Sequence, residues 1–158
     1  MKKSVSLTLL LGTLASFLAF AQTAENTEPL AVERFALYIA ANDGGEGREQ
    51  LRYAISDAKR LAQTLEEVGG IQNRNSIILT NPGRRQIHEA FDLFAERIAE
   101  RKGKARRTEF IVYYSGHSDE TALLMGGETF SYSELKESLA RVPSDVHVVM
   151  LDSCFSGS

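Results

Sequence analysis

Cysteine is almost absent from this sequence: its 158 residues include one, Cys154. A chain with one cysteine forms no internal disulfide, so its fold must be stabilised by a packed core. An unpaired thiol is a liability in an oxidising compartment unless it is buried or used. Two interpretations of Cys154 therefore stay open at this point, an inert buried thiol and a functional one.

Patterns that would hold a metal or a nucleotide are also missing. The chain has three histidines, and no spacing of His, Cys and Glu fits a zinc site. The glycine-rich segment 42–47 is not followed by Gly-Lys-Ser/Thr, and it lacks the Rossmann spacing of glycines. We expect no metal and no cofactor; no calcium-loop pattern is present, and dependence on calcium stays open.

An excess of positive charge is lacking too. The chain holds 18 Lys and Arg against 21 Asp and Glu, a formal net charge of −3. Removal of residues 1–21, which contain two lysines and no acidic residue, makes this charge −5. Such a balance argues against a surface for nucleic acid or for an anionic membrane.

The chain has one long apolar run, and this run lies at the N-terminus. Lys2 and Lys3 precede the apolar residues 5–20, and Ala19-Phe20-Ala21 has the small-x-small pattern of a cleavage site. The run is short and no stop-transfer sequence follows, which indicates a secretory signal peptide over residues 1–21 rather than a membrane span. We expect a secreted or periplasmic protein.

The remaining residues predict one domain. Residues 22–33 are polar and are expected to form a flexible leader, and residues 34–158 form the domain. Within it, strand-like and helix-like patterns alternate. The predicted strands are 35–40, 76–80, 110–114 and 146–151, with helices over 51–68, around 87–98 and over 131–141, and a hairpin over 122–130.

This alternation predicts an α/β fold, a three-layer sandwich with a mainly parallel sheet in a flavodoxin-like strand order. In such sheets, binding and catalysis occur where the strands end. The strand 110–114 leads to Ser115-Gly116-His117, and the strand 146–151 leads to Asp152-Ser153-Cys154. If these strands are neighbours, His117 and Cys154 lie about 5 Å apart, one strand spacing.

An imidazole beside a thiol stabilises the thiolate and can protonate a leaving amine, so the pair suits a catalytic dyad. The alternative for His117 is a capping or core histidine. The two motifs, Tyr113-Tyr114-Ser115-Gly116-His117 and Leu151-Asp152-Ser153-Cys154-Phe155-Ser156-Gly157, resemble those of the caspase-like cysteine peptidases, particularly the metacaspase-like and bacterial members. The resemblance covers roughly residues 34–158.

The resemblance implies a cysteine-type endopeptidase in which Cys154 attacks the peptide carbonyl and His117 acts as base and acid. The family's oxyanion hole would use the backbone N–H groups of Cys154 and Ser118. Ser118 departs from the family, which usually has glycine after the histidine. A serine donates its N–H there provided that the backbone does not require a conformation reserved for glycine.

In the metacaspase-like branch, two aspartates line the primary substrate pocket, and the matching residues are Asp57 and Asp152. Two carboxylates would attract Arg or Lys before the cut, whereas caspases proper cleave after Asp. Each residue also has a purely structural explanation. Asp57 can stabilise the first turn of a helix, and Asp152 can accept backbone hydrogen bonds at a strand end.

The resemblance further implies two strands with their helices beyond Ser158, so we expect C-terminal strands to be missing from this chain. A longer gene product or a second polypeptide would then complete the sheet, and the activity of the shorter chain is left open. The expected partner is a peptide or protein substrate. Two other functions stay in view: a non-catalytic caspase-like scaffold that binds a partner in the same cleft, and a flavodoxin-like ligand domain.

Overall fold

The computed structural model describes residues 32–153. The predicted signal peptide (1–21), most of the predicted leader (22–33) and Cys154 lie outside the described residues. None of the helices within residues 32–153 combines the length and the apolar character that a membrane span requires.

A four-stranded parallel sheet forms the centre of the domain. The strand order is β2-β1-β3-β7, and every pair of neighbours is parallel. This order is that of the first four strands of a flavodoxin-like sheet, as predicted. The strands are β1 (Val32–Ala40), β2 (Ser76–Thr80), β3 (Arg107–Ser115) and β7 (Val146–Asp152).

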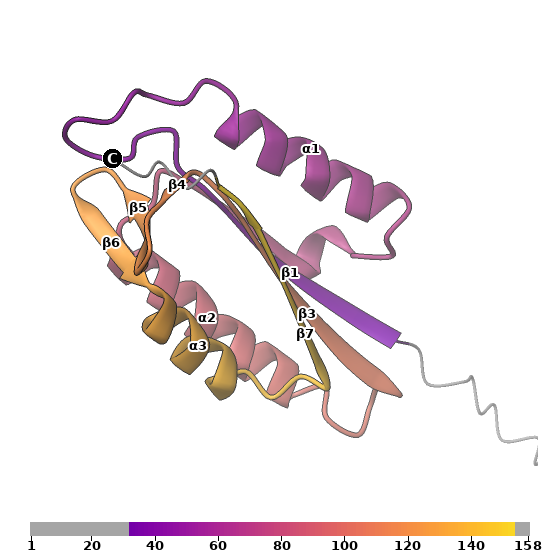
Figure 1. Ribbon diagram of the computed structural model, residues 1–158. Helices are drawn as coiled ribbons and strands as arrows, with labels where there is room; N and C mark the ends of the chain where they lie inside the picture. Colours follow the sequence, from indigo (N-terminus) through magenta and orange to yellow (C-terminus); the bar gives the residue numbers. More distant parts are fainter. Residues whose placement is uncertain (1–31, 154–158) are drawn as a thin grey trace, which may run out of the picture.

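Helices cover both faces of this sheet, so the predicted three-layer sandwich is confirmed (Figure 1). One face carries α1, and the other carries α2 and α3. The helices are α1 (Ala54–Glu67), α2 (Arg84–Ala99) and α3 (Tyr132–Arg141), and a short 3₁₀ helix, η1 (Asn73–Asn75), precedes β2.

The core beneath α2 and α3 is aromatic. The ring of Phe110 on β3 contacts Phe91 edge-on, with centroids 5.9 Å apart, and Phe94 at 5.0 Å. Both phenylalanines lie on α2 at helical spacing, and the three rings are at most 1 % exposed. Such pairs contribute beyond the area that they bury, so this cluster stabilises the packing of α2 on the sheet.

The core beneath α1 is made of smaller residues. Ala36 and Ala40 on β1 face Ala58 on α1, and all three are fully buried. Since alanine adds no bulk beyond Cβ, the helix can lie close to the sheet. The first turn of α1 is thereby held at the carboxyl end of β1 and β3, where the sequence predicted the site.

A second, antiparallel sheet extends the carboxyl end of β3. Its strands are β4 (His117–Ser118), β5 (Ala122–Met125) and β6 (Glu128–Ser131), in that order. The predicted hairpin is present, and Gly126 turns it with φ of 59°. The predicted capping box also forms, because Ser131 Oγ accepts a hydrogen bond from the Glu134 N–H.

One detail differs from the sequence-based expectation. The helix predicted from Leu51 begins at Ala54, since residues 51–53 belong to the loop before it. The strand 146–151 was expected to be an apolar edge unless further strands cover it, and Val148, Val149 and Leu151 are 40 %, 38 % and 43 % exposed. Within the described residues, β7 pairs on one side only, with β3, and this explains its exposure.

The aromatic core gives a first prediction. Phe91→Ala removes a ring that is 1 % exposed and should lower the free energy of unfolding by about 3–5 kcal/mol. Leu93→Ala, on the same helix but at a side chain 37 % exposed, is the matched control and should cost less than about 1 kcal/mol. Urea unfolding followed by circular dichroism measures both, and equal losses would contradict this assignment of the core.

Candidate functional site

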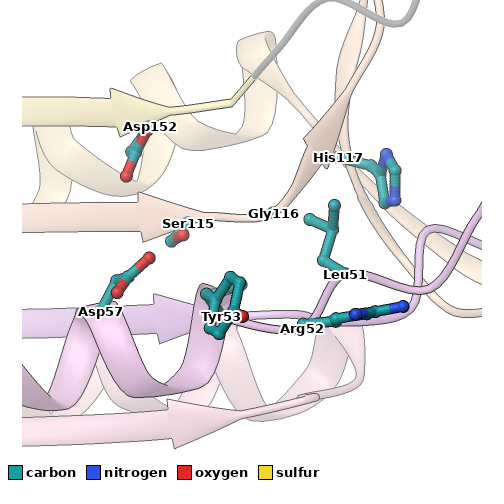
Figure 2. A pocket seen from close by; sticks show the side chains of 9 residues that line it. Leu51, Arg52, Tyr53, Asp57, Ser115, Gly116, His117 and Asp152 are labelled. Carbon is teal, nitrogen blue, oxygen red and sulfur yellow. The ribbon is translucent and has the colours of Figure 1, made fainter.

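A pocket of about 270 Å³ opens at the carboxyl end of the parallel sheet (Figure 2). Its walls come from the loop before α1, the first turn of α1 and the ends of β3 and β7. The lining residues are Leu51, Arg52, Tyr53, Ala54, Asp57, Ser115, Gly116, His117 and Asp152. Three residues singled out from the sequence, Asp57, His117 and Asp152, therefore share one cavity.

The pairing of β3 with β7 brings the two sequence motifs to the same edge. Ser115 lies opposite Asp152 in the parallel register, and the next N–H, that of Gly116, donates to the Asp152 carbonyl oxygen at 3.3 Å. Neighbouring strands are about 4.8 Å apart. The motif that ends in His117 thus lies beside the segment that leads, two residues after Asp152, to Cys154.

The imidazole of His117 is oriented by a backbone carbonyl. Its Nε2 lies 2.8 Å from the Glu49 carbonyl oxygen. A carbonyl oxygen only accepts hydrogen bonds, so Nε2 carries the proton in this contact. In the neutral ring, Nδ1 is then the unprotonated nitrogen and is free to accept a proton.

The ring is also confined by Gly44, a residue that the sequence analysis did not assign to the site. A Cβ atom added at Gly44 would lie 2.5 Å from Cγ of His117, closer than real contacts allow. The sequence showed this segment only as a turn, Asn42 to Gly47. A local pattern does not reveal that the turn packs on a histidine more than seventy residues later.

Asn42 holds the same loop in place. Its side-chain oxygen accepts a hydrogen bond from the Ile55 N–H at 3.2 Å, and its carbonyl oxygen accepts one from the Leu51 N–H at 2.7 Å. Its own N–H donates to the Asn81 side chain at 2.9 Å. The loop that supplies the Glu49 carbonyl is therefore tied to the start of α1 and to the residue after β2.

Asp152 is held by a buried tyrosine. Tyr113 Oη donates to the carboxylate of Asp152 at 2.9 Å, and Tyr113 is 7 % exposed. Burial, followed by this hydrogen bond, raises the pKa of Tyr113 to about 12. The phenol therefore stays protonated at neutral pH and remains a donor to Asp152. The sequence analysis gave Tyr113 no role of its own.

Asp57 lies in the first turn of α1, on the other side of the pocket. Figure 2 shows its carboxylate and that of Asp152 directed toward one another across Ser115. The two acidic side chains thus form opposite walls of one cavity. A cation that enters between them would meet negative charge from both sides.

The chain passes from one sheet to the other at Gly116. A Cβ atom there would lie 2.7 Å from Cζ of Tyr114, so a side chain at this position would collide with the ring. The Tyr114 hydroxyl lies 2.6 Å from the His117 carbonyl oxygen and 2.8 Å from that of Leu124. Its single proton is shared between these two acceptors. Tyr114 therefore fixes the backbone of β4 against β5.

Ser118 has a backbone that an L-residue adopts readily. Asn81, with φ of 45°, is the one non-glycine residue of positive φ within residues 32–153. The condition set for Ser118 from the sequence is thus met. Its side chain is 4 % exposed, and its Oγ donates to Ser153 Oγ at 2.8 Å.

Cys154, the predicted nucleophile, lies outside the described residues. Among residues 32–153, no group of three or more His, Cys, Asp and Glu side chains is arranged to hold a metal ion. The described part of the site therefore consists of an oriented imidazole, two facing carboxylates and the serine pair beside them.

Comparisons with known proteins give one family match and a similar fold. The sequence model of the caspase domain of peptidase family C14 matches residues 33–158. The crystal structure of caspase-1 from Spodoptera frugiperda is similar in fold, with a TM-score of 0.59 at 13 % sequence identity. The aligned region covers 79 % of this chain and 48 % of that one, so this chain spans about half the length of the solved protein.

A search of the curated proteins finds no match. The family match covers most of the chain, and the fold agrees with it. The two sequence motifs that resemble this family begin at the ends of β3 and β7. This chain belongs to the caspase-domain family of cysteine peptidases.

Proposed function

We propose that this protein is a cysteine endopeptidase that cleaves after Arg or Lys, with His117 and Cys154 as its catalytic dyad. The observation that carries the proposal is the parallel pairing of β3 with β7, which ends with Ser115 opposite Asp152. Membership of the caspase-domain family supports the reaction type. The apolar N-terminal run supports export, and a secreted or periplasmic location is part of the proposal.

The reaction follows from the tautomer of His117. The unprotonated Nδ1 takes the proton of the Cys154 thiol, and the thiolate attacks the carbonyl carbon of the peptide bond. The backbone N–H groups of Ser118 and Cys154 would stabilise the oxyanion, as the family resemblance implies. The imidazolium then protonates the leaving amine, and water hydrolyses the thioester with His117 again as base.

The Glu49 carbonyl supports this cycle at each step. The partial negative charge on its oxygen stabilises the imidazolium when Nδ1 is protonated, because the Nε2–H contact becomes charge-assisted. The contact also keeps the ring from turning Nε2 toward the thiol. A backbone carbonyl here performs the orienting task that a carboxylate performs in a serine protease triad.

The facing carboxylates support a basic residue before the cut. Asp57 and Asp152 direct their carboxylates at one cavity, and Arg52, a cation that also lines it, extends away from both of them (Figure 2). An Arg or Lys side chain in it would form charge-assisted hydrogen bonds, whereas an Asp side chain would be repelled. The hydroxyl of Tyr113 keeps Asp152 directed across the pocket mouth.

The dyad predicts how Cys154 reacts with an electrophilic peptide probe that carries Arg. Cys154→Ala should abolish labelling, and His117→Ala should slow it about 10- to 30-fold at pH 7, because an ordinary thiol of pKa about 8.5 is only a few per cent thiolate there. His147→Ala is the control, since His147 contacts the Val142 carbonyl oxygen away from the pocket. Mass spectrometry measures the rates.

Labelling of Cys154 at the wild-type rate in His117→Ala would show that His117 takes no part in the reaction. Absence of labelling in the full-length wild-type protein would instead favour the non-catalytic scaffold, which binds its partner without using the thiol.

The acidic pocket predicts substrate preference. Asp152→Asn should lower kcat/KM for an Arg-ending reporter peptide about 10- to 100-fold, since a hydrogen bond to a charged group contributes about 1.5–3 kcal/mol. Asp57→Asn should act in the same direction. Asp92→Asn, at an exposed carboxylate on α2, is the control. A wild-type enzyme that cleaves Asp-ending peptides and ignores Arg-ending ones would show that the assignment of the pocket is wrong.

The contact between Gly44 and His117 predicts the effect of one added methyl group. Gly44→Ala places Cβ against the imidazole and should lower kcat about 100-fold, the order of loss expected from a displacement of about 1 Å. Gly127→Ala is the control, because no atom lies within 4 Å of a Cβ added there. Steady-state kinetics of both variants gives the comparison, and equal kcat values would mean that the ring does not depend on Gly44.

A further inference from the structure

We propose that Ser118 is a positioning residue for the nucleophile: its hydroxyl donates to Ser153 Oγ and anchors the backbone segment that leads into Cys154. The inference rests on the proposed peptidase function and goes beyond it, since it assigns a task to the side chain of Ser118 and not to its N–H. The contact is 2.8 Å between the two oxygen atoms.

The anchor is needed because the two strands separate at this point. Within residues 32–153, the last main-chain contact between the end of β3 and β7 is the long one from the Gly116 N–H to the Asp152 carbonyl oxygen, at 3.3 Å. After Gly116 the chain turns away into β4, which pairs with β5. The hydroxyl of Ser118 reaches back across this divergence to the next residue along, Ser153.

Ser118 is a rigid support for such a contact. It lies opposite Leu123 in the antiparallel register, Leu123 is fully buried, and Ser118 itself is 4 % exposed. A buried hydroxyl needs a hydrogen-bond partner, and Ser153 supplies it. Ser153 is only partly buried and follows the last residue of β7, so the contact fixes the less supported of the two residues.

The effect on chemistry comes through the covalent chain. Ser153 is bonded to Cys154, and a displacement of about 1 Å in a reacting group can cost a factor of about 100 in rate. Glycine, the residue that the family usually has after the histidine, has no hydroxyl to offer. The departure at Ser118 thus adds a link between the strand that carries His117 and the segment that leads to Cys154.

The test is a double-mutant cycle in the full chain with Ser118→Ala, Ser153→Ala and the double variant. Ser118→Ala keeps the backbone N–H, so it removes the side-chain contact alone. Each single variant should lower kcat for an Arg-ending reporter about 5- to 10-fold with KM changed less than two-fold, as for one lost hydrogen bond. The double variant should lose no more than either single one.

A second measurement uses no peptide cleavage. The rate of Cys154 alkylation by iodoacetamide is followed against pH in the same four proteins. Loss of the anchor should slow alkylation at pH 7 and move the midpoint of the profile upward, toward about 8.5, the value of an ordinary thiol. Ser138→Ala, which removes a fully buried serine hydroxyl on α3, is the matched control and should leave both kcat and the profile unchanged.

Additive losses, or wild-type kcat and alkylation in both single variants, would overturn the role of Ser118. If the full-length wild-type protein cleaves no peptide, the proposed function is wrong, and the alkylation cycle alone then decides on the anchor. Equal and non-additive slowing in that cycle would support it, and no change would refute it.

Discussion

The parallel pairing of β3 with β7 is the constraint on which the rest of the site depends. It brings two segments separated by more than thirty residues to one edge of the sheet, with Ser115 opposite Asp152. A shift of one residue in this register would exchange the faces of the strand and turn Asp152 away from Asp57. Two hydrogen bonds from Thr108 on β3 to the carboxylate of Asp145, the residue just before β7, help to hold this register.

The imidazole of His117 depends on a different set of contacts from those that fix this register. His117 belongs to the antiparallel sheet, its ring is held by the Glu49 carbonyl, and Gly44 closes one side of it. The loop 41–53 supplies both of these contacts. Asn42 ties that loop to the start of α1, and so the imidazole, the acidic wall at Asp57 and the end of β2 share one hydrogen-bonded framework.

Much of this architecture was readable from the sequence. Continuous apolar runs predicted the four parallel strands, and Ser131 with Glu134 predicted the capped start of α3, since these are signals within a few residues of one another. The strand-end motifs placed His117 and Asp152 at the same edge, the family resemblance added Asp57, and the structure brings all three into one pocket. The family resemblance drawn from those motifs is confirmed by the match over residues 33–158.

What the sequence did not predict are contacts between distant segments. Nothing near Gly44 indicates that it packs against His117, and nothing near Tyr113 indicates a hydrogen bond to Asp152. The separate strand His117–Ser118 was also missed, because two residues are too few for a periodic pattern. The edge position of β7 followed from the family resemblance rather than from its apolar run, which looks the same at an edge as in the middle of a sheet.

The passage of the chain from one sheet to the other at Gly116 gives the two sides of the pocket different supports. Asp57 and Asp152 are attached to α1 and β7, whereas the backbone of His117 belongs to the antiparallel sheet. The loop 41–53 joins the two sides, because it contacts the imidazole and is hydrogen-bonded to the start of α1. A substitution in this loop should therefore disturb both sides of the pocket together, whereas one in the turn of the hairpin should disturb the imidazole side alone.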